Sequence, residues 1–298
     1  MRIAIIGANS FIARNMIYLI DREYPEAELF LYDYGEEQAD GHAGYSRLDV
    51  MSMESLQQVN WDVDAVFVFV GKTGTLNGFE EYRTFISINE IALLNMLTEY
   101  RRQGSTAKLI FPSTRLVYKG SEELLSEDAE KEFKTVYAIN KFACETYLRQ
   151  YHELYGVNYC AVRICVPYGS MIPNASSYGT AGFMIKKAAA GENISLYGDG
   201  LQRRTFTHME DLCSILMEIA CNEACAGDVY NIGGEDYSLK AVAEYVASLY
   251  NVGVDYVEWP EESARIESGS TVFNDSKLQA LIGHKWKNSL KDWVRNER

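Results

Sequence analysis

The sequence predicts an α/β fold in which a doubly wound parallel sheet is followed by a smaller C-terminal lobe. Along the first 166 residues, short apolar runs alternate with segments of helical periodicity, as expected for strands buried on both faces of a parallel sheet. After about Pro167 this alternation loosens into a stretch rich in Gly, Ser and Asn. We therefore expect one domain over residues 1–166, a smaller lobe over 167–298, and a crossover that returns to the first domain near 205–234.

The expected elements follow one another in a regular order. The first strand covers RIAIIG (2–7), and a helix continues to about Arg22. Further strands are expected at 28–33, 48–50, 64–71, 107–113 and 157–164, with helices over 79–102 and 135–155. Short apolar runs thus alternate with segments of helical spacing, which is the pattern of a doubly wound sheet. VYNIGG (229–234) is expected to cross back toward the first domain.

Composition limits the partners. Of the 298 residues, 47% are hydrophobic and 23% are charged, as in ordinary globular enzymes, and the net charge is −14. This charge argues against nucleic acid or an anionic membrane as the partner, so an anionic ligand has to meet locally placed Arg or Lys. The chain opens on a strand and has no apolar run of about 18 residues, which predicts a cytoplasmic protein. Six cysteines without a C-x-x-C pattern and four histidines predict reduced core thiols and no metal site.

The first strand-to-helix turn, IIGANSFIA (5–13), has the position of a dinucleotide phosphate loop. Gly7 supplies the tight turn, while Ser10 and Ala13 stand at the second and third glycine positions of such a loop. Ser10 is small enough for close approach of a pyrophosphate if its φ stays negative, and Ala13 suits helix–strand packing. On its own, the turn fits a simple strand–Gly–helix corner equally well.

The second strand ends on an acidic residue, Asp33. A carboxylate at this place can accept the adenosine ribose hydroxyls of a dinucleotide and repels a 2′-phosphate. The next arginine along the chain is Arg47. A bound dinucleotide would therefore be NAD rather than NADP; the alternative is a solvated Asp at a strand end.

The candidate chemistry lies in TVYAINK (135–141). Tyr137 and Lys141 are four residues apart and so share one helix face, where the ammonium can lower the pKa of the phenol and make it a base. The preceding strand ends in Ser113 and Thr114, so a hydroxyl can meet the Tyr above the carboxyl edge of the sheet. The spacing alone proves nothing, because one such pair is expected by chance.

These motifs, in this order, resemble the extended short-chain dehydrogenases/reductases, specifically the NAD-dependent epimerase/dehydratase group with its UDP-glucose 4-epimerase-like nucleotide-sugar enzymes. The most distinctive match is LYGDGLQRRTFTHMEDL (196–212). The resemblance implies a Rossmann-type cofactor domain, NAD as cofactor, and a nucleotide-diphosphate sugar as substrate. The catalytic set that it implies is Thr114, Tyr137 and Lys141. The cofactor-binding set is Gly7, Ser10, Phe11, Ile12, Asp33, Asp49, Val50, Val70, Gly71, Lys72, Asn89, Ser113, Tyr137 and Lys141, and the substrate-binding set is Thr114, Tyr197, Arg204 and Arg265.

The chain also departs from the family pattern. Family members often have an Asn where this chain has Val166, and the 4,6-dehydratases place Asp-Glu directly after the catalytic Thr, where this chain has Arg115 and Leu116. A dehydratase is therefore disfavoured, and the resemblance implies 4-epimerisation through a 4-keto sugar. The alternatives are an NAD(P)H-dependent 4-keto-sugar reductase and a non-catalytic NAD-binding sensor. The family also implies a homodimer formed through helices 79–102 and 135–155.

Overall fold

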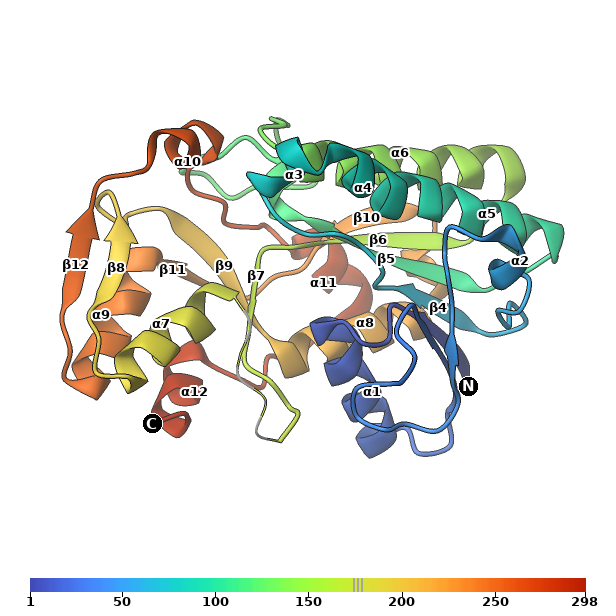
Figure 1. Ribbon diagram of the computed structural model, residues 1–298, viewed down its shortest axis with the longest axis horizontal. Coiled ribbons are helices and arrows are strands. Elements are labelled where there is room, and N and C mark those ends of the chain that lie inside the picture. Colours follow the sequence, from blue (N-terminus) through green and yellow to red (C-terminus); the bar gives the residue numbers. More distant parts are fainter. Residues whose placement is uncertain (174, 176, 178) are drawn as a thin grey trace.

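The computed structural model describes residues 1–173, 175, 177 and 179–298. Its largest sheet has seven parallel strands in the order β10-β6-β5-β4-β1-β2-β3 (Figure 1). These strands are β1 (Arg2–Ile6), β2 (Glu28–Asp33), β3 (Tyr45–Arg47), β4 (Ala65–Val68), β5 (Lys108–Thr114), β6 (Tyr159–Ile164) and β10 (Asp228–Asn231). The chain reverses its winding direction between β1 and β4, so the predicted doubly wound sheet is confirmed.

Both faces of this sheet are buried. Successive side chains of each strand point to opposite sides, so each strand contributes to both cores. In β1, Ile3 and Ile5 pack into one core, and Ala4 and Ile6 pack into the other. Helices α1 (Phe11–Glu23) and α8 (Met209–Cys221) cover the first face, and α2 (Met53–Leu56), α5 (Ala92–Arg102) and α6 (Val136–Tyr155) cover the second. The continuous apolar runs seen in the sequence follow from this burial on two sides.

The expected single helix over 79–102 is interrupted. It consists of α3 (Asn77–Glu80), α4 (Tyr82–Ile86), a π-helical turn η1 (Ser87–Ile91) and α5. A π turn leaves a backbone carbonyl available to other donors, and here Cys144 Sγ donates to the carbonyl oxygen of Asn89. The prediction of one regular helix was therefore wrong in the middle of the segment.

The predicted position of the strand at 48–50 was also wrong by a few residues, since β3 covers Tyr45–Arg47. Leu48 and Val50 are buried and gave the segment its apolar pattern. However, the backbone turns at Asp49, whose carboxylate accepts a hydrogen bond from the Met51 N–H and whose carbonyl accepts one from Ser52. This turn ends the ladder between β2 and β3.

The other described strands form two small sheets. One contains β7 (Val166–Tyr168), β9 (Arg203–His208) and β11 (Glu235–Ser238), and the other contains β8 (Ile194–Tyr197) and β12 (Val254–Val257). Helices α7 (Gly179–Ala189), α9 (Leu239–Tyr250) and α12 (Leu290–Asn296) enclose a separate apolar core with them. The remaining elements are α10 (Glu261–Ile266), α11 (Ser276–Ile282) and the short 3₁₀ turns η2 (Arg115–Val117) and η3 (Glu223–Cys225).

The chain returns to the large sheet through α8 and β10, and β10 pairs with β6. After α11, the ring of His284 bonds to Asp211 and Glu218 of α8, and these contacts hold the C-terminal segment to the large sheet's layer. A domain boundary at 166/167 stays a prediction. Within the described residues, no helix combines the length and apolarity needed to cross a membrane; the cytoplasmic location also stays a prediction.

Candidate active site

A cavity of about 420 Å³ opens at the carboxyl ends of the central strands. Its walls come from the β1–α1 turn, the end of β4, the end of β5, α6 and the β6–β7 connection. Carboxyl ends beside a switch point are where open parallel sheets bind ligands. Nine of the predicted site residues line this cavity: Ser10, Phe11, Ile12, Val70, Gly71, Ser113, Thr114, Tyr137 and Lys141.

The β1–α1 turn has the geometry that its sequence predicts. Gly7 has φ +92°, and a Cβ there would lie 2.4 Å from the backbone nitrogen of Val70, so only glycine fits. Ser10 keeps a negative φ of −69° and caps α1, with its side chain accepting a hydrogen bond from the Ala13 N–H. Ala13 is fully buried against the sheet. The start of α1 therefore faces the cavity, as a pyrophosphate site requires.

A second cavity, of about 450 Å³, adjoins the first at Val70. Its lining includes Gly7, Asp33, Asp49 and Val50. The two carboxylate oxygens of Asp33 accept hydrogen bonds from the N–H groups of Asn9 (2.8 Å) and Tyr34 (2.7 Å). The predicted ribose acid is thus held in place at the end of β2.

Arg47 lies much closer to this second cavity than its sequence position indicates. Strand β3 pairs with β2 so that Arg47 is opposite Asp33. Its guanidinium lies over the ring of Tyr34 and forms an ion pair with Glu36 at 3.3 Å. The cation beside the predicted ribose site is therefore engaged in an exposed pair with a carboxylate.

Two residues predicted to bind the cofactor, Asn89 and Lys72, line neither cavity. Asn89 is buried in the π turn, where its side chain accepts a hydrogen bond from the Lys72 N–H (2.8 Å) and donates to the Lys72 carbonyl (3.1 Å). The ammonium of Lys72 pairs with Glu81. In this arrangement Asn89 positions the 70–72 segment that forms the cavity wall.

The predicted catalytic residues meet at the first cavity. Thr114 ends β5 and is 7% exposed, Tyr137 lies in the first turn of α6, and Lys141 follows one turn later. Lys141 Nζ donates to the Pro112 carbonyl (2.7 Å) and lies 5.9 Å from the centre of the Tyr137 ring. Burial lowers the pKa of Lys141 to about 8. An ammonium, a phenol and a hydroxyl therefore surround one cavity.

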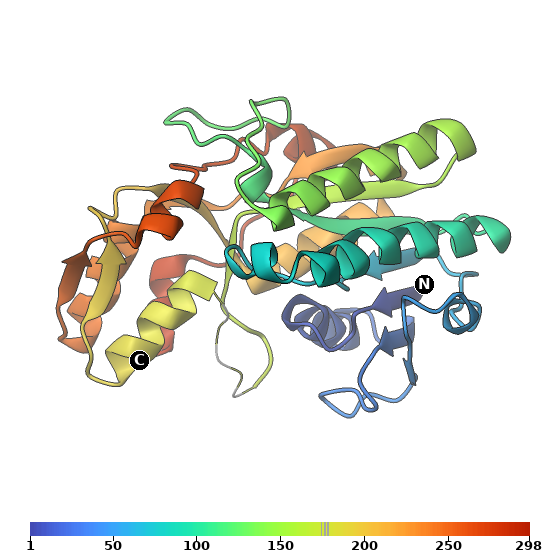
Figure 2. The same ribbon diagram turned by 45° about the horizontal axis from the view of Figure 1, so that its top comes forward.

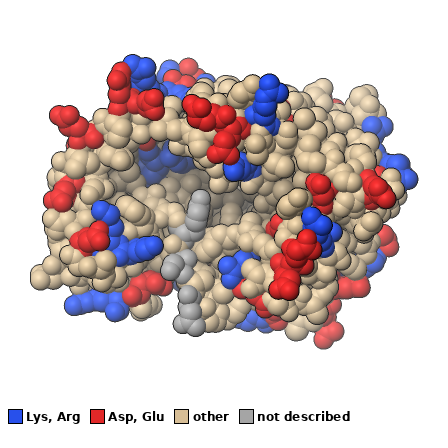
Figure 3. All heavy atoms as spheres, in the orientation of Figure 1, with Lys and Arg blue, Asp and Glu red and all other residues tan. Residues whose placement is uncertain are grey.

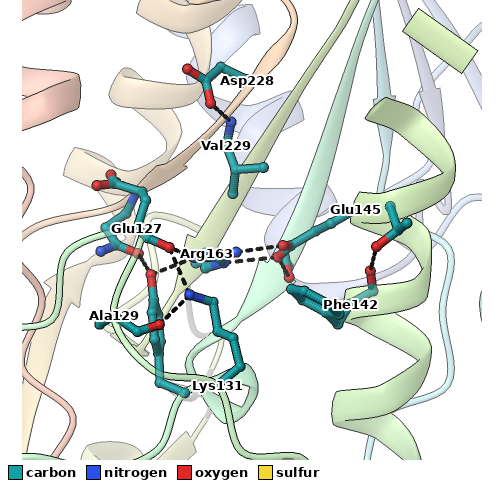
Figure 4. A network of polar contacts seen from close by, with 12 residues as sticks. Glu127, Ala129, Lys131, Phe142, Glu145, Arg163, Asp228 and Val229 are labelled. Carbon is teal, nitrogen blue, oxygen red and sulfur yellow. Dashed lines mark hydrogen bonds and ion pairs between the residues drawn. The ribbon is translucent and has the colours of Figure 1, made fainter. Parts of the chain in front are cut away.

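A buried polar network supports these residues from behind. Arg163 of β6 forms a two-bond ion pair with Glu145 of α6, with nitrogen–oxygen distances of 3.0 and 2.6 Å (Figure 4). Glu145 also accepts a hydrogen bond from the hydroxyl of Ser113, while Arg163 donates to Tyr118 Oη at 2.6 Å. The network links β5, β6 and α6, which carry the catalytic set.

Sequence reasoning missed this network. Tyr137, Lys141 and Glu145 are each four residues apart on α6, so a third polar residue on a buried helix face was the available signal. Glu145 also accepts a hydrogen bond from the hydroxyl of Ser113, a residue predicted to bind the cofactor. The Ser113 hydroxyl is therefore already engaged by Glu145, although the residue lines the cavity.

The remaining substrate-binding candidates line neither cavity. Arg204 of β9 is 2% exposed and pairs with Glu267 at 2.6 Å. Arg265 lies on the surface of α10 and pairs with Glu261. Tyr197 lines a separate pocket of about 310 Å³, where its ring lies 5.0 Å from that of Trp259, a residue that the sequence analysis did not select.

The family model of the NAD dependent epimerase/dehydratase family matches residues 3–233. The chain belongs to this family. NAD is the cofactor of the family, as the sequence predicted. Its members with similar sequences include UDP-glucuronate 4-epimerase of Thermodesulfobacterium geofontis, which is 26% identical over 194 residues. That alignment covers 64% of this chain and 58% of the relative, so the chain spans under two thirds of that relative's length.

Other relatives in the family match over more of the chain. UDP-N-acetyl-alpha-D-glucosaminuronate decarboxylase of Bacillus cytotoxicus is 27% identical over 273 residues, which are 88% of this chain and 84% of the relative. The solved structure of Thermus thermophilus UDP-glucose 4-epimerase in complex with NAD superposes with a TM-score of 0.85 at 20% identity, covering 99% of this chain and 97% of that one. The family and its fold are thus shown. The relatives, however, are named for different reactions, epimerisation and decarboxylation.

Proposed function

We propose that this protein is an NAD-dependent nucleotide-sugar 4-epimerase. The observation that carries the proposal is the meeting of Thr114, Tyr137 and Lys141 at one cavity, opposite the start of α1. A protein that only sensed NAD would have no use for a hydroxyl, a phenol and an ammonium around the same space. The family membership supports an enzyme acting on nucleotide sugars.

The residues present fit the cofactor. Two cavities that adjoin at Val70 give an elongated site, with Asp33 in one and Tyr137 in the other. The start of α1 between them suits a pyrophosphate, and the Asp33 carboxylate suits a ribose diol. NAD, when bound, supplies the group that accepts a hydride and returns it.

The chain's own residues then handle a proton. Tyr137 takes the proton from the sugar 4-hydroxyl as that carbon becomes a ketone, and Thr114 hydrogen-bonds the same oxygen. The nearby ammonium of Lys141 favours the ionised phenol that this step requires. After the keto sugar has turned over, Tyr137 returns the proton to the oxygen, and the 4-epimer results.

The nucleotide end of the substrate is assigned to the smaller sheets. We infer that Tyr197, together with Trp259, contacts the base, because aromatic faces stack on bases. Arg204 and Arg265 remain the proposed diphosphate contacts. Their pairs with Glu267 and Glu261 have to open for this, since each guanidinium already holds a carboxylate.

The experiment that tests the proposal starts from protein purified without added nucleotide. We expect NAD to be released when this protein is denatured, because an epimerase reuses one cofactor within each turnover. The same protein should interconvert a UDP-hexose and its 4-epimer with no cofactor supplied, as followed by NMR. Cofactor-free protein that consumed NADH only with a 4-keto sugar would instead be the reductase, and NAD-bound protein without turnover would be the sensor.

Tyr137→Phe tests the proposed base. The variant keeps the ring but loses the phenol, so turnover should fall about 10²–10⁴-fold while NAD content stays the same. Tyr147→Phe is a matched control, because this phenol of the same helix donates to Glu90 and lies outside the cavity. If Tyr137→Phe retained more than about a tenth of the wild-type rate, another group would be the base.

We further propose a homodimer formed by the helices on one face of the large sheet. Helices α5 and α6 run side by side on one face of the large sheet (Figure 2). Ile86 of α4, Ile91 of the π turn and Ile139 of α6 are 39%, 41% and 50% exposed, although Leu97 of α5 and Leu148 of α6 face the core. Exposed isoleucines on adjoining helices suit an isologous contact. Sedimentation at micromolar concentration that gave a monomer would contradict the dimer.

A further inference from the structure

Arg115 occupies an unusual place beside the proposed reaction site. It directly follows Thr114 and begins the 3₁₀ turn η2 at the carboxyl end of β5. The one hydrogen bond of its guanidinium runs from Nη1 to Ser268 Oγ at 3.3 Å, and it forms no ion pair with any carboxylate of the described residues. A partly buried guanidinium without an anionic partner is costly unless a ligand supplies the anion.

The neighbouring arginine is fully engaged by contrast. Arg204 donates to Glu267 at 2.6 Å and to the carbonyls of Gly269 (2.5 Å) and Arg203 (2.9 Å). The carboxylate of Glu267 forms its ion pair with Arg204 and acts on Arg115 only through its charge at longer range. The group formed by Arg115, Arg204 and Glu267 therefore has more positive than negative charge, within a chain whose net charge is −14.

The pKa of Arg115 agrees with its lack of a directly paired carboxylate. Burial, and then the charge of Arg204, lower the pKa of Arg115 to about 10. The protein environment therefore disfavours the charge on Arg115 as it stands. An anion bound beside the guanidinium would reverse this effect, because an opposite charge stabilises the ionised form.

Arg115 itself does not line the first cavity, but residues beside it do. Cys165 lines the first cavity together with Thr114. Thr114 of β5 pairs with Ile164 of β6, so Arg115 and Cys165 each follow the end of one of two neighbouring strands. Burial raises the pKa of the Cys165 thiol, and the charges of Arg115 and Arg204 oppose that rise. Figure 3 shows this face of the molecule hollowed between its two parts, with basic side chains on the wall of the hollow.

We propose that Arg115 binds a carboxylate on the sugar, so that the substrate is a nucleotide-linked hexuronic acid. This rests on the proposed function, in which Thr114 contacts the sugar 4-hydroxyl. In a hexuronic acid the carboxylate is attached to C5, next to the reacting C4, whereas the diphosphate is attached to C1 across the ring. The residue that follows Thr114 is therefore placed for the carboxylate, which a guanidinium can hold through two parallel hydrogen bonds.

Binding by titration calorimetry tests this inference with three probes: UDP-glucuronate, UDP-glucose and UDP. We expect the NAD-loaded wild-type protein to prefer UDP-glucuronate to UDP-glucose. Arg115→Gln should weaken UDP-glucuronate about ten- to hundredfold, the range for a charged hydrogen-bonded contact, and change the other two less than about threefold. Arg115→Lys keeps the charge but loses the paired geometry and should fall between. Arg149→Gln, which changes an exposed arginine on α6, is the matched control.

The other outcomes are distinct. Equal losses for all three ligands in Arg115→Gln would show that Arg115 binds the diphosphate, and a wild-type preference for UDP-glucose would show that no carboxylate is recognised; either result overturns the inference. Ligand discrimination as expected, but without interconversion of the epimers, would refute the proposed reaction and leave the carboxylate site standing. No binding of any probe would overturn both.

Discussion

Replacing Arg163 by methionine should destabilise the protein strongly, since it breaks the ion pair behind the active site. Arg163 and Glu145 each have only 4% of the side chain exposed. Without the guanidinium, the Glu145 carboxylate stays buried with the Ser113 hydroxyl as its remaining side-chain donor. Removing one partner of a buried pair costs about 3–5 kcal/mol, because an uncompensated charge is left in the interior.

The expected change in melting temperature follows from the size of the chain. Unfolding entropy is about 2.1 cal/mol/K per residue, which for 298 residues amounts to about 0.6 kcal/mol/K. A loss of about 3–5 kcal/mol therefore corresponds to a melting temperature lower by about 5–8 °C. Circular dichroism during heating, checked by calorimetry, measures this shift.

A second variant separates the charge effect from simple loss of packing. Arg163→Met combined with Glu145→Leu should recover much of the lost stability, because apolar residues of similar volume often replace a buried ion pair without net cost. Lys119→Met is the control, since it breaks an exposed pair with Glu130 and should leave the melting temperature unchanged. The reasoning fails if the double variant melts no higher than Arg163→Met alone, or if Arg163→Met melts like the wild type.

Two further predictions concern the cofactor and pH. Asp33→Ala should weaken NAD binding roughly tenfold to a hundredfold through loss of charged hydrogen bonds to the ribose, and it should improve NADP binding; wild-type protein that bound NADP more tightly than NAD in a titration would refute this. Burial alone would lower the pKa of His284, but its hydrogen bonds to two carboxylates of α8 outweigh burial and raise the pKa above 6.5. The charged ring therefore stabilises the fold below about pH 6.5, and this contribution is lost as pH rises through the folded-state pKa. The melting temperature of His284→Asn should differ most from that of the wild type at the acidic end of a pH 5–9 series, and an equal difference throughout would contradict the assignment.

Much of the fold was predictable, because its signals are local. The central strands β1, β4, β5 and β6 of the large sheet contain apolar runs, and the conformation of Ser10 follows from its position as a helix cap. The juxtaposition of Arg47 and Asp33 was not, since it depends on the register of two strands that are separated by a long loop. Counting residues to the next arginine along the chain therefore underestimated how close a cation lies to the cofactor site.

In the candidate site, too, local features were predictable from the sequence and long-range contacts were not. Spacing on one helix placed Tyr137 and Lys141 correctly at the cavity, because helical periodicity fixes which side chains share a face. The partner of Glu145 comes from β6, and no spacing rule connects a helix to a strand of the sheet below it. Likewise, a motif can nominate Arg204, but only the folded chain brings Glu267 to its guanidinium.

The π turn at Ser87–Ile91 sets the rotational phase of two helical segments. Each residue of an α-helix advances the side-chain direction by about 100°, so the extra residue that a π turn accommodates offsets everything after it by about that angle. Phe85 of α4 is buried before the turn, and Leu93, Met96 and Leu97 of α5 are buried in the core after it. A one-residue deletion within the turn would restore regular winding and rotate Asn89 away from Lys72, or rotate α5 out of its core. The cavity wall at 70–72 is in this sense aligned by an irregularity in a helix that does not itself line the first cavity.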